Sequence, residues 1–130
     1  MGKIIEFYRH SDAIHVHKEN GTDVSYYIFD EYEIHRNIMK AHTIQEWHYH
    51  SKIDESLFVV KGELTAYWIE EGHKKKEIIH PNEIVRVKQS VHTFENETDE
   101  DIEFIVFRFV PDHVDKKDII KNDKFLWEEL

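Results

Sequence analysis

Apolar and polar residues alternate in short runs along most of the chain, a pattern typical of half-buried β-strands. β-Branched and aromatic residues crowd these runs, as in "SYYIF", "LFVV" and "FIVFRF", and such residues favour strands. Turn-forming residues separate the runs, among them Gly21, Gly62, Gly72 and Pro81. The pattern predicts strands over residues 4–8, 13–17, 25–29, 32–41, 56–61, 64–70, 76–79, 84–88, 92–95 and 102–110.

Many short strands at nearly even spacing indicate an all-β fold, an antiparallel sandwich or barrel. A chain of 130 residues is the size of one domain, and no repeat or linker divides it. We expect the barrel to span residues 32–110. The strands within residues 1–31 then belong to the barrel or to a dimer contact, and residues 111–130 form a separate amphipathic tail.

The tail has a different pattern. Its apolar residues fall near a helical stripe, which predicts a short C-terminal helix: Ile119, Ile120, Leu126, Trp127 and Leu130. The run Phe125-Leu126-Trp127 is too apolar to stay in water, so the tail packs on its own barrel or docks on a second subunit.

Composition narrows the function. The formal charge of −10 argues against a nucleic-acid or anionic-membrane surface, because both require clustered cations. Without cysteine, the chain forms no disulfide and no thiolate metal site. The N-terminal residues lack the apolar core of a signal peptide, and no apolar run is long enough to span a bilayer. These features favour a cytoplasmic protein.

Candidate chemistry lies in the stretch "EWHYHSKIDESLFVVKG". Residues two apart in a strand share a face, so His48 and His50 can present both imidazoles to one point. The pair His15 and His17 has the same spacing but no acidic residue at the matching offset. The surroundings of His48 and His50 therefore decide the interpretation.

Glu55 stands at an odd offset from His50, so a corner must intervene before the acid can turn back to the histidines. The best candidate for a third nitrogen ligand is His92, which opens a later strand. Three imidazoles and one carboxylate would suit a divalent transition metal: iron, manganese, nickel, cobalt or zinc. Such a set leaves coordination positions open for water, oxygen or substrate.

These residues carry a family resemblance. The order His48, His50, Glu55, Gly62 is similar to the first motif of the cupins, and "PNEIVRVKQSVHTFEN", with His92 and Asn96, resembles the second. The resemblance covers roughly residues 32–110. It implies a double-stranded β-helix, that is, a jelly-roll barrel, with His48, His50, Glu55 and His92 as metal ligands. It also implies a homodimer, with the N-terminal strands and the apolar C-terminus available for the contact.

Several other side chains are candidates for the lining of a substrate pocket: Tyr27, Arg36, Met39, His42, Tyr67, Phe94, Phe104 and Arg108. A cationic member of this group would favour an acidic small molecule. The remaining histidines, His35 among them, are expected at surface or turn positions.

Three classes of function remain open. The first is a small-molecule enzyme of dioxygenase, isomerase or decarboxylase type with a three-histidine, one-glutamate metal centre. The second is a non-catalytic cupin that binds a small ligand as a sensor or scavenger. The third is a structural or storage role, which predicts a metal with no open coordination position.

Overall fold

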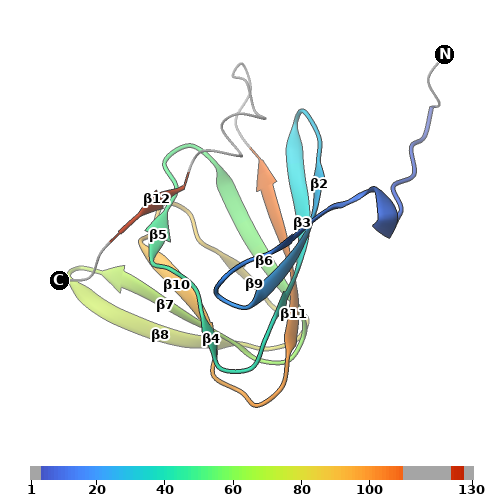
Figure 1. Ribbon diagram of the computed structural model, residues 1–130. Coiled ribbons are helices and arrows are strands. Elements are labelled where there is room, and N and C mark those ends of the chain that lie inside the picture. Colours follow the sequence, from blue (N-terminus) through green and yellow to red (C-terminus); the bar gives the residue numbers. More distant parts are fainter. Residues whose placement is uncertain (1–3, 110–123, 128–130) are drawn as a thin grey trace.

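The computed structural model describes residues 4–109 and 124–127, and in these residues the regular structure is almost entirely β (Figure 1). A single 3₁₀ turn, His10–Asp12, precedes the first strand. The strands are β1 (Ile14–His17), β2 (Thr22–Ile28), β3 (Tyr32–Met39), β4 (Thr43–Ile44), β5 (His48–Tyr49), β6 (Asp54–Lys61), β7 (Leu64–Glu70), β8 (His73–Ile79), β9 (Ile84–Arg86), β10 (His92–Asn96), β11 (Ile102–Phe109) and β12 (Phe125–Leu126).

The strands form two antiparallel sheets. Sheet A has the order β1-β2-β3-β11-β6-β9, and sheet B has the order β12-β5-β10-β7-β8, with β4 paired to β10. Figure 1 shows the two sheets as facing walls of a barrel, with the residues before β1 leading away from it. Strands that are distant in sequence are neighbours in both sheets, which is the jelly-roll arrangement expected from the sequence.

The core lies between the sheets. Alternate residues of β3, β6 and β11 are buried, as period-two strands with one inward face require. The packed apolar side chains come from both sheets: Met39, Leu57, Val59, Leu64, Ala66, Ile79, Val87, Phe94, Ile102, Phe104 and Val106. Each large side chain buried in this way contributes about 1.5–3 kcal/mol through its removal from water.

Asn96, at the end of β10, forms hydrogen bonds with residues around the end of β3 and in the segment that precedes β11. Its side chain is completely buried, and its amide nitrogen donates to the carbonyls of Met39 at 3.0 Å, Lys40 at 3.1 Å and Glu100 at 2.7 Å. Its Oδ1 accepts from the backbone N–H of Thr98 at 2.9 Å. The asparagine therefore satisfies several buried backbone groups where β10 ends, in the strand that carries His92.

Two predictions from the sequence were wrong. Residues 4–8 form no strand, and the apolar side chains there are exposed. The C-terminal helix is absent from the described part of the tail, because Phe125–Leu126 instead form strand β12 against β5. The other tail residues, 110–123 and 128–130, lie outside the described residues. Among the helices that the structure describes, none is long and apolar enough to cross a membrane.

Candidate metal centre

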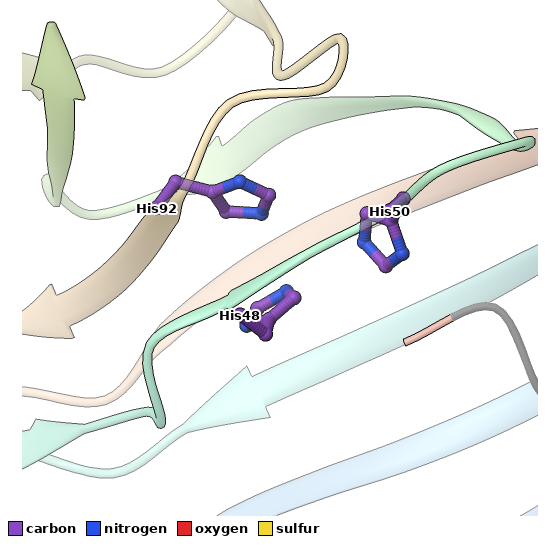
Figure 2. Close-up of side chains that lie close together, drawn as sticks. All are labelled: His48, His50 and His92. Atoms are coloured by element: carbon purple, nitrogen blue, oxygen red, sulfur yellow. The ribbon is translucent and has the colours of Figure 1, made fainter. Parts of the chain in front are cut away.

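Strand pairing brings three histidines together. His48 of β5 lies directly opposite His92 of β10, and His50 follows two residues after His48. All three are buried, and each offers a ring nitrogen within 4.8 Å of those of the other two. Figure 2 shows the three rings around a common space. The convergence that the sequence predicted from two distant segments is present in the fold.

Backbone contacts fix the orientation of two of these rings. The Nδ1 of His48 lies 2.9 Å from the carbonyl of Glu46, and the Nδ1 of His92 lies 2.9 Å from the carbonyl of Ser90. A carbonyl only accepts, so each Nδ1 carries the proton and each Nε2 keeps a lone pair. The Nε2 of His92 is buried and has no hydrogen-bond partner among the described residues. This is the arrangement typical of metal-ligating histidines.

Burial keeps these imidazoles neutral. It lowers the pKa of His48 to about 3, and the nearby ring of His92 adds to this effect. The pKa of His92 is lowered by burial as well. A metal binds the neutral imidazole, so both side chains are in the ligating form at neutral pH.

Glu55 lies beside His50 and Arg108. Its Oε2 is 2.6 Å from the Nε2 of His50 and 3.3 Å from the Nε of Arg108. Burial alone would raise the pKa of the Glu55 carboxyl, but the Arg108 guanidinium and then His50 outweigh it and lower that pKa far below its usual range. The group is therefore a carboxylate. It is not one of the three groups whose ligand atoms converge, so its position suits either a fourth ligand or a hydrogen-bond partner that orients His50.

The donor set fits a divalent transition metal. Imidazole nitrogens suit zinc, iron, nickel and copper ions, and an added carboxylate extends the range to manganese. Three buried neutral imidazoles without a cation between them would leave a buried lone pair such as that of His92 Nε2 unsatisfied. The side chains present are thus consistent with the metal centre predicted from the sequence.

Two cavities flank the histidines. The smaller, of about 30 Å³, is lined by His48 and Glu55 together with mainly polar side chains: Lys18, His35, Asn37, Gln45, Leu57, Phe94, Phe104, Val106, Arg108 and Lys124. The larger, of about 450 Å³, reaches His92 between β7, β8 and β9, and apolar side chains form much of its wall, among them Ala66, Trp68, Ile79, Val85, Val87 and Phe94. The second volume is in the range of small-molecule pockets.

Some of the pocket residues predicted from the sequence line these two cavities, and others do not. Arg108, Phe94 and Phe104 line the small cavity, and Tyr67 and Phe94 line the large one. Met39 is completely buried in the core. The other three candidates line neither of the two cavities: Tyr27, Arg36 and His42.

Contacts elsewhere account for two of these three. Arg36 donates to both carboxylate oxygens of Glu103, with Nε at 2.9 Å and Nη2 at 3.1 Å. The Nε2 of His42 lies 2.6 Å from Asp99, and both of these side chains are exposed.

Sequence reasoning missed the polar inner face of β3. His35 was expected at the surface, but it is only 3% exposed, and Glu33 and Asn37 on the same face are buried too. Glu33 lies directly opposite Arg108 of β11, and Arg108 lies opposite Glu55 of β6. A carboxylate, a guanidinium and a second carboxylate therefore occupy neighbouring positions across sheet A. The available signal was the alternation Glu33-x-His35-x-Asn37, which puts the three polar side chains on one face of the strand.

Comparisons with known proteins agree with this architecture. Residues 35–108 match the family described as Cupin domain, so the chain belongs to the cupins. A comparison with curated proteins found no match. Among solved structures, the chain is similar to oxalate decarboxylase from Bacillus subtilis at pH 4.6, with 17% identity and a TM-score of 0.74, covering 97% of this chain and 33% of that one.

Two further solved structures are similar. One is the Lactobacillus farciminis oxalate decarboxylase formate complex, with 19% identity and a TM-score of 0.73, covering 97% of this chain and 37% of that one. The other is the capsular polysaccharide assembling protein CapF from Staphylococcus aureus, with 18% identity and a TM-score of 0.71, covering 90% and 34%. The chain spans about a third of the length of these proteins, and the likeness shows the fold alone.

Proposed function

We propose that this cupin is a metal-dependent small-molecule enzyme of dioxygenase, isomerase or decarboxylase type. His48, His50 and His92 would hold a divalent transition metal, with Glu55 as fourth ligand or as the partner of His50. The observation that carries the proposal is the convergence of three buried ring nitrogens within 4.8 Å. The oxalate decarboxylases among the similar folds support including decarboxylation, by analogy of fold only.

The protein's own groups have defined tasks in such a site. The carbonyls of Glu46 and Ser90 hold the rings of His48 and His92 in the tautomer that binds a metal. Leu57, Phe94 and Phe104 add apolar surface to the mainly polar lining of the small cavity. When bound, the metal would supply Lewis-acid stabilisation of negative charge on substrate oxygens.

The first experiment measures the metal. Protein purified without an affinity tag is analysed for its element content, before and after loading with iron(II), manganese, cobalt, nickel or zinc. We expect about one ion per chain in the unmodified protein and less than a tenth of that in His50→Ala, which retains its β-sheet circular dichroism. The control is His15→Ala, because His15 belongs to the exposed His-x-His pair of β1.

The second experiment separates an enzyme from a binding protein. Each metal-loaded form is assayed with a panel of 2-oxo acids, hydroxy acids, catechols and sugar derivatives, following oxygen uptake, carbon dioxide release and product formation. Turnover that is lost in His50→Ala supports the enzyme. A ligand that is bound and released unchanged by fully loaded protein would favour a sensor or scavenger, and a filled site that exchanges no ligand would favour a structural role.

A further inference from the structure

The small polar cavity gathers positive charge in an otherwise acidic protein. Its lining includes three cationic side chains, Lys18, Arg108 and Lys124, and one carboxylate, Glu55. The whole chain carries a formal charge of −10, so three cations around one small cavity are more than the average composition of the chain would place there. Glu55 lies against Arg108, and Lys124 lies 3.8 Å from Glu46. Lys18 makes no ion pair with any residue in the described ranges.

The surroundings of Lys18 disfavour its charged form. It is half-buried, and burial lowers the pKa of Lys18, with the charges of Lys124 and Arg108 lowering it further. The carboxylates of Glu46 and Glu55 offset part of this effect, but neither forms an ion pair with Lys18. A partly desolvated ammonium without an ion-pair partner is stabilised when an anion binds beside it.

His35 adds a directed donor to the same cavity. Its Nδ1 lies 3.2 Å from the Nδ2 of Asn37, an amide nitrogen that can only donate, so the proton of the neutral ring is on Nε2. That Nε2 is buried without a hydrogen-bond partner among the described residues, and so is the Nε of Arg108. The Oε1 of Glu33 lies 3.8 Å from the Nε2 of His35, which is too far for a hydrogen bond. The Nε2–H of His35 thus lacks an acceptor among the described residues, whereas the Nε of Arg108 has an ion-pair contact with Glu55 that falls short of hydrogen-bond geometry.

We propose that this cavity binds the carboxylate of a small organic acid, with Lys18, Arg108 and the Nε2–H of His35 as donors. The inference rests on the proposed function in one respect: because His48 and Glu55 line the same cavity, the remainder of the acid would reach the metal. The volume of about 30 Å³ is space for about two water molecules, which suits one carboxylate group and excludes a larger anion such as a sugar phosphate.

The test compares acetate with acetamide, its uncharged analogue of the same shape. Binding of each is measured by calorimetry and by histidine-ring NMR, in metal-free protein and in zinc-loaded protein. We expect acetate to bind at least tenfold more tightly than acetamide in both forms. Lys18→Met and His35→Phe should each weaken acetate binding about tenfold, whereas Lys75→Met, on the exposed face of β8, should leave it unchanged.

Metal content separates this proposal from the previous one. Lys18→Met should bind zinc as tightly as the unmodified protein, because Lys18 is not among the candidate ligands. If no variant or form of the protein binds zinc but acetate still binds through Lys18, the metal centre is wrong and the anion site stands. Equal binding of acetate and acetamide, or equal effects of Lys18→Met and Lys75→Met, would overturn the anion site.

Discussion

Gly62 illustrates how much one residue of the first motif contributes to the fold. It joins β6 to β7 with a φ of +86°, in the left-handed region that favours glycine. A Cβ added there would lie 2.3 Å from the Cγ2 of Ile102, whose side chain is fully buried in the core. The sequence predicted a turn at this glycine, and the structure has a turn that combines a positive φ with a close approach to Ile102.

Gly62→Ala should therefore destabilise the protein by about 2–4 kcal/mol, the sum of backbone strain and overpacking against Ile102. The control is Gly72→Ala. Gly72 has a similar φ of +78°, but an added Cβ would meet nothing within 4 Å, so only the strain of about 1 kcal/mol applies. Urea unfolding of both variants measures the difference. Equal losses of stability in the two variants would show that Ile102 shifts away from the added methyl group without a loss of unfolding free energy.

His35 makes a prediction about acid. Burial, reinforced by the charge of Arg108, lowers the pKa of His35 well below 6.5, so the folded protein keeps this ring neutral. Below pH 6.5 the unfolded chain binds a proton there that the folded protein does not, so stability falls as the pH falls. At pH 5 this difference is at most about 2 kcal/mol, the limit for a ring that stays neutral in the folded protein.

The measurement is urea unfolding of metal-free protein between pH 7.5 and pH 5. The loss of unfolding free energy across that interval should be smaller in His35→Gln than in the unmodified protein, by up to about 2 kcal/mol, whatever the absolute stability of the variant. Parallel curves for the two proteins would show that His35 becomes protonated in the folded state as readily as in the unfolded chain.

The same residue shows where sequence reasoning stops. The strand 32–39 has Glu33, His35 and Asn37 on one face and Ile34 and Ile38 on the other, and the usual rule assigns the polar face to solvent. Here the polar face is the buried one. The sequence of a strand shows which residues share a face, but it does not show whether that face is inward or outward. Here the interior of the barrel is partly polar, so the usual assignment is inverted.

At the scale of elements, β12 supports the strand that carries His48. Leu126 pairs with His48 on one side of β5, and His92 pairs with it on the other. The rings of Phe125 and Tyr49 stack with centroids 5.1 Å apart, and the N–H of Trp127 donates to the carbonyl of Trp47 at 3.1 Å. A strand as short as β5 depends on such neighbours for its position.

Phe125→Ala should therefore weaken metal binding about tenfold, comparable to the loss of an outer-shell partner of a ligand. The control is Ile78→Ala on β8, since Ile78 is 42% exposed and Phe125 is 43% exposed. Titration with zinc in competition with a coloured chelator gives both affinities. If the two variants bind zinc equally well, β5 holds His48 without help from the C-terminal strand.

Element predictions succeeded where periodicity extends over several residues and failed where it does not. Strands such as β7, Leu64–Glu70, and β1, Ile14–His17, were predicted within one residue at each end. The tail was assigned a helix because a few apolar residues lie near a helical spacing, while β12 has only two residues and no periodicity to detect. Local sequence also leaves the pairing of β5 with β10 undetermined. It offered His92, at the start of a later strand, only as the best candidate for a third ligand, and the family resemblance agreed with that choice.

At the scale of the whole molecule, the N-terminal part of the described chain exposes several large apolar side chains. The segment before β1 exposes four large side chains: Ile4, Ile5, Phe7 and Tyr8. Ile14 and Val16 of β1 are 56% and 41% exposed, and β1 is the terminal strand of sheet A. An edge strand beside an exposed apolar segment is a surface on which another chain can pair and pack.

We expect a second copy of the chain to cover this surface, giving a homodimer. Light scattering after size exclusion should then report about twice the chain mass of 15.8 kDa. Val16→Asp should shift the mass toward that of one chain, because a charge in the centre of an apolar contact loses its water without gaining a partner. Ile44→Asp is the control, since Ile44 is 50% exposed on β4 in the other sheet. A single-chain mass for the unmodified protein would show that no dimer forms. A dimer that persists in Val16→Asp but dissociates in Ile44→Asp would place the contact on the other sheet.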